Sequence, residues 1–99
     1  MSFVNAHPEM LTAAAGQLQG IGTVLTAQNA AAAGPTTGVA PAAADEVSAM
    51  TATQFGAHAA LYQAVSAQAA AMHEMFVHVL GASAGSYAAT EAANAIAAI

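Results

Sequence analysis

The large apolar residues between positions 47 and 80 recur at the spacing of a helix, and this pattern most constrains the fold. At the rotation of an α-helix they share one arc, about 160° wide. The opposite side carries Gly56, Gln63 and Ala70. The pattern therefore predicts one long, continuous helix, with this arc formed by Val47, Met50, Phe55, Leu61, Tyr62, Val65, Met72, Met75, Phe76, Val79 and Leu80.

The rest of the chain also indicates helix. Alanine accounts for 32 of the 99 residues, and no run of β-branched residues alternates with polar ones. Pro8 suits the first position of a helix because it has no N–H, and Glu9 favours the positive helix end. Gly34-Pro35 marks a stop. We predict helices over about 8–33 and 42–84, a loop over 34–41 and a flexible tail over 88–99.

These elements predict an all-α fold in one domain over 1–99. A short loop makes the two helices an antiparallel hairpin, and we expect the longer second helix to overhang the first from about residue 68. Only 25 side chains are large and apolar, so the core is thin. A partner chain that supplies helices is expected to cover an interface made of Phe55, Leu61, Tyr62, Val65 and the overhanging Met72, Met75, Phe76, Val79 and Leu80.

Composition excludes several functions. The chain has no Lys or Arg and a net charge of −5, which argues against nucleic-acid binding and against a cleavable signal peptide with a basic start. Residues 10–44 are uncharged, yet they contain amides, glycines and two prolines, so a simple membrane-spanning helix is not favoured. Membrane association stays open. Because Cys is absent, no disulfide or thiolate site can form.

Catalytic and metal patterns fail on inspection. Gly81-Ala-Ser83-Ala-Gly85 matches the G-x-S-x-G nucleophile elbow, but no strand is predicted before Ser83 and no His follows His78. His73-Glu74 and His78 have one residue more than the zinc-protease motif, which places the two imidazoles about 140° apart. We therefore expect no enzyme activity, no metal site and no cofactor.

Three segments together resemble the PE family of mycobacteria. The start MSFVNAHPEMLTAAAGQL has the Pro8-Glu9 pair that names the family, and GVAPAAADEVSAM resembles its link between two helices. The segment SYAATEAAN contains Tyr87-x-x-x-Glu91, which matches the Y-x-x-x-D/E export motif of type VII secretion substrates. The resemblance covers essentially the whole chain.

This resemblance implies a hairpin that completes a four-helix bundle with a PPE protein. It also implies export by type VII secretion, with an export chaperone bound through the PPE partner. By analogy Tyr87 and Glu91 form the export signal, and the destination is the medium, the cell surface or the outer envelope. The alternative is an outer-membrane-associated PE–PPE component of solute uptake. From their spacing alone, Tyr87 would simply pack against a partner and Glu91 would be a solvated charge.

Overall fold

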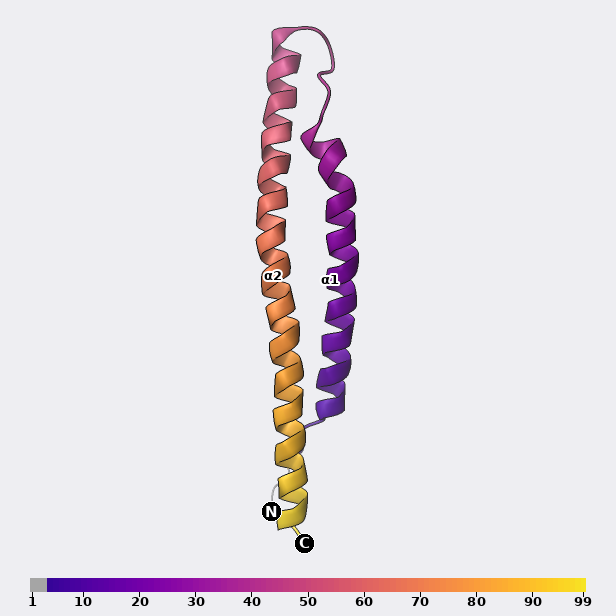
Figure 1. Ribbon diagram of the computed structural model, residues 1–99, viewed down its shortest axis with the longest axis vertical. Coiled ribbons are helices and arrows are strands. Elements are labelled where there is room, and N and C mark those ends of the chain that lie inside the picture. Colours follow the sequence, from indigo (N-terminus) through magenta and orange to yellow (C-terminus); the bar gives the residue numbers. More distant parts are fainter. Residues whose placement is uncertain (1–3) are drawn as a thin grey trace. The chain divides into compact units, whose positions relative to one another are not determined.

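The computed structural model describes residues 4–99 and contains two helices (Figure 1). Helix α1 comprises Pro8–Thr37, and helix α2 comprises Glu46–Ala97. Across residues 4–99 there is no strand, so the all-α prediction is confirmed. Neither helix has a stretch long and apolar enough to cross a bilayer within this part of the chain.

Two compact units divide these helices between them. The first unit joins the chain up to Gly22 with His73–Ile99, and the second unit is Thr23–Met72. In the second unit the end of α1, the connection 38–45 and the first half of α2 form an antiparallel hairpin. In the first unit the start of α1 lies antiparallel to the second half of α2. Both helices therefore contribute to both units.

Local hydrogen bonds explain where α1 begins and ends. It begins at Pro8, as predicted, and the His7 carbonyl accepts the Met10 N–H at 3.0 Å. It continues past the predicted end at residue 33 and includes Pro35. At its end the Gly38 N–H donates to the Gly34 carbonyl at 3.0 Å, which satisfies one of the last four carbonyls, and the hydroxyl groups of Thr36 and Thr37 each donate to a carbonyl four residues earlier at 2.6 Å.

Helix α2 is also longer than predicted. It begins at Glu46 rather than 42, because Asp45 caps it: the Ser48 N–H donates to Asp45 Oδ2 at 2.9 Å, and the Ser48 hydroxyl donates to Oδ1 at 2.6 Å. It runs to Ala97 rather than 84, so residues 88–97, predicted as a tail, are helical. Gly81 and Gly85 do not end it, because alanine favours helix on both sides of them.

The capping bonds predict a pH-dependent helix start. The hydrogen bond from the Ser48 side chain, followed by that from its backbone, holds the pKa of Asp45 below its ordinary value of 3.8. Because the pKa is lower in the folded state, the charged cap stabilises the fold fully above the ordinary value of 3.8. This stabilisation is lost as the pH falls through the lower pKa of the folded state. Acidification below about pH 4 should therefore lower the protection of the Ser48 amide against exchange, relative to its intrinsic rate at the same pH, several-fold. Asp45→Asn, which keeps an acceptor but does not titrate, should remove this dependence. Equal acid sensitivity in both proteins would contradict it.

Small and polar residues form the contact between α1 and α2, along a line of α2 that we call the small-residue seam. In the second unit it comprises Ala52, Gly56, Ala59 and Gln63, and in the first unit His73, Val77, Leu80 and Ala84. Every member is buried or half-buried. The positions alternate in steps of three and four, which keeps them on one side of the helix. Val77, which is not among the residues of the predicted arc, and Leu80 are the two larger apolar members of the seam.

In the second unit, close backbone approach and two amides hold the seam together. A Cβ on Gly56 would lie 3.0 Å from the Thr37 carbonyl oxygen, so glycine lets the helices approach there. Further along, the Tyr62 hydroxyl donates to Asn29 Oδ1 at 2.7 Å, and Gln63 Nε2 donates to the Asn29 carbonyl at 2.9 Å. These bonds join side chains to a helix whose neighbouring residues are mostly alanine.

A histidine has the same role in the first unit. His73 Nε2 donates to the Leu18 carbonyl at 2.6 Å. A Cβ added to Gly22 would lie only 2.7 Å from Cδ2 of the His73 imidazole, so the absence of a side chain at Gly22 leaves room for the ring. The buried apolar residues among residues 4–99 are four alanines, Ala15, Ala52, Ala59 and Ala84, and each keeps 3–9% of its surface exposed. No large side chain is buried in this part of the chain. The hairpin therefore lacks a conventional core of large apolar residues.

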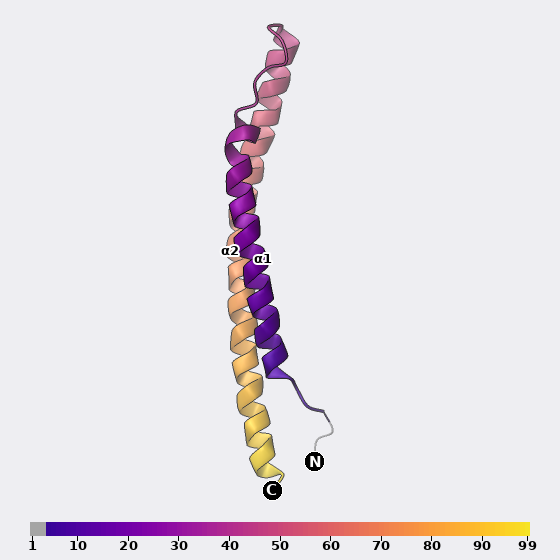
Figure 2. The ribbon, with the colours of Figure 1, turned by 90° about the vertical axis from the view of Figure 1, so that its right-hand side faces the viewer.

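The predicted overhang from about residue 68 is wrong. In the first unit α1 lies along α2 at His73 and beyond, as the bond to Leu18 shows. The error came from placing the end of α1 opposite the start of α2. Instead Thr37 lies beside Gly56, and residues 38–45 return to Glu46 as non-helical chain (Figures 1 and 2).

Candidate functional site

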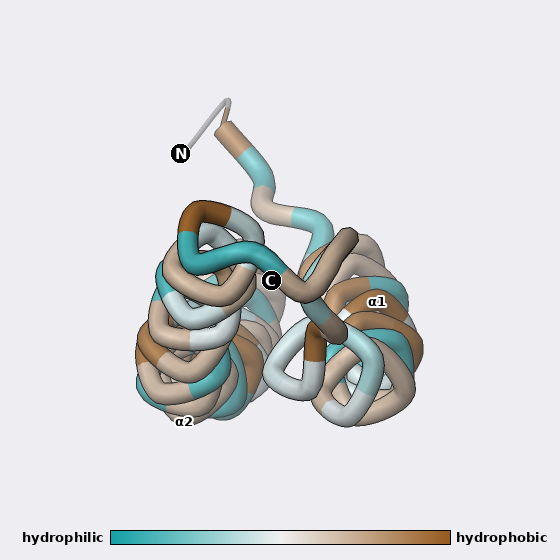
Figure 3. The backbone as a smooth tube through the Cα atoms, turned by 90° about the horizontal axis from the view of Figure 1, so that it is seen from above, coloured by the Kyte–Doolittle hydropathy of each residue, from teal (hydrophilic) through white to brown (hydrophobic). Residues whose placement is uncertain are grey.

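The candidate functional site is the apolar face of α2, which lies outside its seam. In the second unit this face comprises Phe55, Leu61, Tyr62, Val65 and Met72, and in the first unit Met75, Phe76 and Val79. Each of these side chains is at least half exposed. Viewed from the loop end, apolar positions reach the outer sides of both helices (Figure 3). Leu80, predicted with this group, lies on the seam instead and is half-buried.

The apolar side chains in the second half of α2 are exposed for a reason other than the predicted overhang. Met72, Met75, Phe76 and Val79 were expected to be bare because α1 would not reach them. In the structure α1 contacts the seam, and these side chains point to other sides of α2. Burying one such side chain contributes about 1.5–3 kcal/mol, so their exposure leaves much hydrophobic stabilisation unused. A row of them is typical of a protein-interaction surface.

The start of α2 extends this face in the second unit. A shallow, open depression there is lined by Val47, Met50, Thr51, Gln54, Phe55 and His58, all on one side of the helix. Val47 and Met50 were on the predicted arc but were not included in the predicted interface. Their helical spacing was the signal that could have placed them there.

Helix α1 also has an exposed apolar side. In the first unit it presents Met10 and Ile21, and in the second unit Val24 and Leu25. Two other large apolar residues of this helix, Leu11 and Leu18, are half-buried. In each unit the hairpin thus offers apolar side chains from two helices rather than one.

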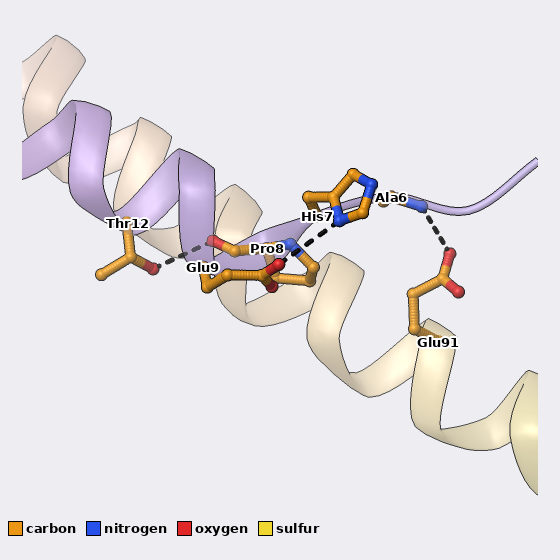
Figure 4. Close-up of polar contacts among 6 residues, drawn as sticks. All are labelled: Ala6, His7, Pro8, Glu9, Thr12 and Glu91. Carbon is orange, nitrogen blue, oxygen red and sulfur yellow. Dashed lines mark hydrogen bonds and ion pairs between the residues drawn. The ribbon is translucent and has the colours of Figure 1, made fainter.

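The Tyr87 and Glu91 pair lies in the first unit, and the two side chains differ in their surroundings. Tyr87 is 51% exposed. Glu91 is half-buried, and its Oε1 accepts a hydrogen bond from the Ala6 N–H at 3.0 Å (Figure 4). The prediction from spacing that Glu91 is a solvated charge is therefore wrong, because the carboxylate is engaged within the chain.

The Pro8 and Glu9 pair forms the start of α1 (Figure 4). The Pro8 carbonyl accepts the Thr12 hydroxyl at 3.2 Å, and Glu9 Oε1 lies 3.3 Å from His7 Nδ1. Both Glu9 and His7 are exposed. These contacts are local, so the pair shapes the first turn of the helix.

The residues that suggested catalysis or metal binding have structural surroundings. His73 is hydrogen-bonded to a backbone carbonyl of α1, so its Nε2 is engaged. No group of three or more His, Asp or Glu residues suited to a metal ion occurs in residues 4–99. Ser83 is within α2 and follows helix rather than a strand. The G-x-S-x-G match therefore lacks the strand-turn-helix geometry of a nucleophile elbow.

Comparison with known proteins places the chain in a family. Residues 4–94 match the PE family. The PE family protein PE13 of Mycobacterium tuberculosis is 68% identical over 98 residues, and the match covers 99% of each chain. PE8 of the same organism is 60% identical over 98 residues, which are 36% of its length. The PE-PGRS family protein PE_PGRS33 is 61% identical over 95 residues, or 20% of its length. The chain therefore spans nearly all of one relative and a minor part of the others, and it belongs to the PE family.

Proposed function

We propose that this chain is a non-enzymatic pairing module that forms a heterodimer with a PPE protein and is exported with it by a mycobacterial type VII secretion system. An export chaperone holds the pair through the PPE chain. The destination is the medium, the cell surface or the outer envelope. No catalytic step and no cofactor enter this proposal.

One observation carries the pairing: the seam of α2 consists mainly of alanine, glycine, glutamine and histidine, with Val77 and Leu80, while most large apolar side chains of α2 are exposed. An isolated hairpin of this kind leaves most of its apolar surface in water. Two partner helices laid against α2 and the exposed side of α1 would bury it and complete a four-helix bundle. Because the chain has no Lys or Arg, it can offer only five carboxylates and four histidines to salt bridges with a partner, and we expect apolar contact to provide most of the affinity.

The export half of the proposal rests on Tyr87 and Glu91. They occur at the motif spacing one helical turn apart near the end of α2, and Tyr87 is exposed in the first unit. A receptor can therefore contact the aromatic ring without unfolding the helix. The family membership supports the analogy from which the motif was assigned.

Co-production with the PPE protein of the same locus tests the pairing. We expect the chain made alone to self-associate or aggregate, because its apolar face is uncovered. With the partner it should elute as a single 1:1 complex in size-exclusion chromatography with light scattering. A soluble monomer that melts cooperatively without any partner would contradict the proposal.

A further inference from the structure

The carboxylate of Glu91 links α2 to residues 4–7, the described part of the segment before Pro8, in the first unit. Its Oε1 accepts the N–H of Ala6, 85 residues away in sequence, at 3.0 Å (Figure 4). Ala6 and Glu91 are both half-buried. Ala6 belongs to the non-helical segment before Pro8, so no helical carbonyl is available to its N–H.

The register of α2 explains why residue 91 meets this segment. Glu91 lies seven residues after Ala84, which is 3% exposed, and Ala84 lies seven after Val77 on the seam. Steps of seven keep these residues on the side of α2 that packs against α1. Because α1 begins at Pro8, the seam beyond Ala84 has no helix to contact, and the segment before Pro8 lies there instead.

We infer that Glu91 is a positioning residue: it holds the segment before α1 against α2, so that this segment and the exposed ring of Tyr87 form one composite export surface. This inference rests on the proposed function. Under it, the acidic residue of the motif acts through Ala6 inside the chain, and the export machinery contacts Tyr87 and the segment rather than the carboxylate.

The chemistry of the contact sets a clear requirement. The Ala6 N–H needs an acceptor oxygen at the end of the residue 91 side chain. Glutamine has the same length as glutamate and provides such an oxygen without the charge. Glu91→Gln should therefore keep the contact, whereas Glu91→Ala removes it. On the other side, Ala6→Pro removes the donor and leaves Glu91 unchanged. Proline is compatible with the non-helical backbone there, although it restricts Asn5 to extended conformations.

The test uses the full chain co-produced with its PPE partner. Amide hydrogen exchange of the segment before Pro8 and the secreted fraction in a mycobacterial host are measured for each variant. We expect Glu91→Ala and Ala6→Pro to speed exchange of the segment about tenfold, measured for Ala6→Pro at His7, and to lower the secreted fraction at least fivefold. Glu91→Gln and the control Ala6→Ser, which keeps the N–H, should stay within twofold of the wild type. Size-exclusion chromatography confirms that each pair still forms.

Two results would overturn the inference. If Glu91→Gln keeps the slow exchange but is retained in cells like Glu91→Ala, the machinery recognises the charge itself. If Ala6→Pro is secreted normally, the segment is not part of the signal. A failure of the proposed function is distinct: the wild-type pair would then be absent from the culture filtrate, and the exchange data alone would decide whether Glu91 positions the segment.

Discussion

Phe76→Asp is expected to abolish binding of the PPE partner while the hairpin itself remains folded. Phe76 is 54% exposed on the apolar face of α2 in the first unit and is not a seam residue. Its replacement therefore leaves the packing between α1 and α2 unchanged, and the hairpin should still fold. In the complex, however, it would place a carboxylate among apolar side chains, and this chain has no Lys or Arg to neutralise it. An uncompensated buried charge costs about 3–5 kcal/mol, which corresponds to a loss of affinity of roughly 100- to 5,000-fold.

The measurement is a titration of each purified chain against the partner, with circular dichroism to show that helix content is unchanged. His78→Asp is the matched control, because it introduces the same carboxylate two residues later at an exposed position on the opposite side of α2. It should bind within threefold of the wild type. Binding of Phe76→Asp at wild-type strength would show that this part of α2 is not in the interface.

The helical architecture could be predicted because it depends on local signals. Pro8 fixes the start of α1 and alanine favours helix on both sides of the loop. The ends were less predictable, since they depend on capping contacts made in the folded chain. Asp45 sets the start of α2 by its bonds to Ser48, and the bond from the Gly38 N–H to the Gly34 carbonyl closes the last turn of α1 beyond Pro35.

The packing face of α2 could not be predicted from periodicity. A helical wheel identifies the side with large apolar residues, and the usual expectation is that this side packs inward. Here Ala52, Ala59 and Ala84 are the buried residues, and glycine at position 56 allows close approach. Which of two sides faces α1 depends on shape as well as hydropathy. A chain that keeps its large residues for a partner reverses the usual assignment.

The contact between Ala6 and Glu91 was outside the reach of sequence patterns altogether. It joins a backbone N–H to a side chain 85 residues later, and a backbone donor has no sequence signature. The motif spacing located Glu91 but gave it no internal partner. Only the register of α2, continued from Val77 through Ala84, brings this residue to the segment before Pro8.

Tyr87→Ala is expected to leave pairing intact and to retain the protein in cells. The Tyr87 ring is half exposed. Because α1 begins only at Pro8 and lies antiparallel to α2, we expect it to reach the level of the buried Ala84 but not to cover Tyr87. Its loss therefore costs little folding stability, and the affinity for the partner should change less than threefold. If the ring is what the export machinery contacts, removing a central aromatic anchor should cost at least about 2 kcal/mol of that interaction and lower the secreted fraction more than tenfold.

Immunoblots of pellet and culture filtrate, with a cytosolic protein as lysis control, measure the secreted fraction. Tyr87→Phe is the matched control, because it keeps the ring and removes only the hydroxyl. It should be secreted at close to the wild-type level if the ring provides the contact. Normal secretion of Tyr87→Ala would remove this residue from the signal. Loss of both export and pairing would instead assign Tyr87 to the partner interface, since a ring that only packs against the PPE chain cannot be removed without weakening the pair.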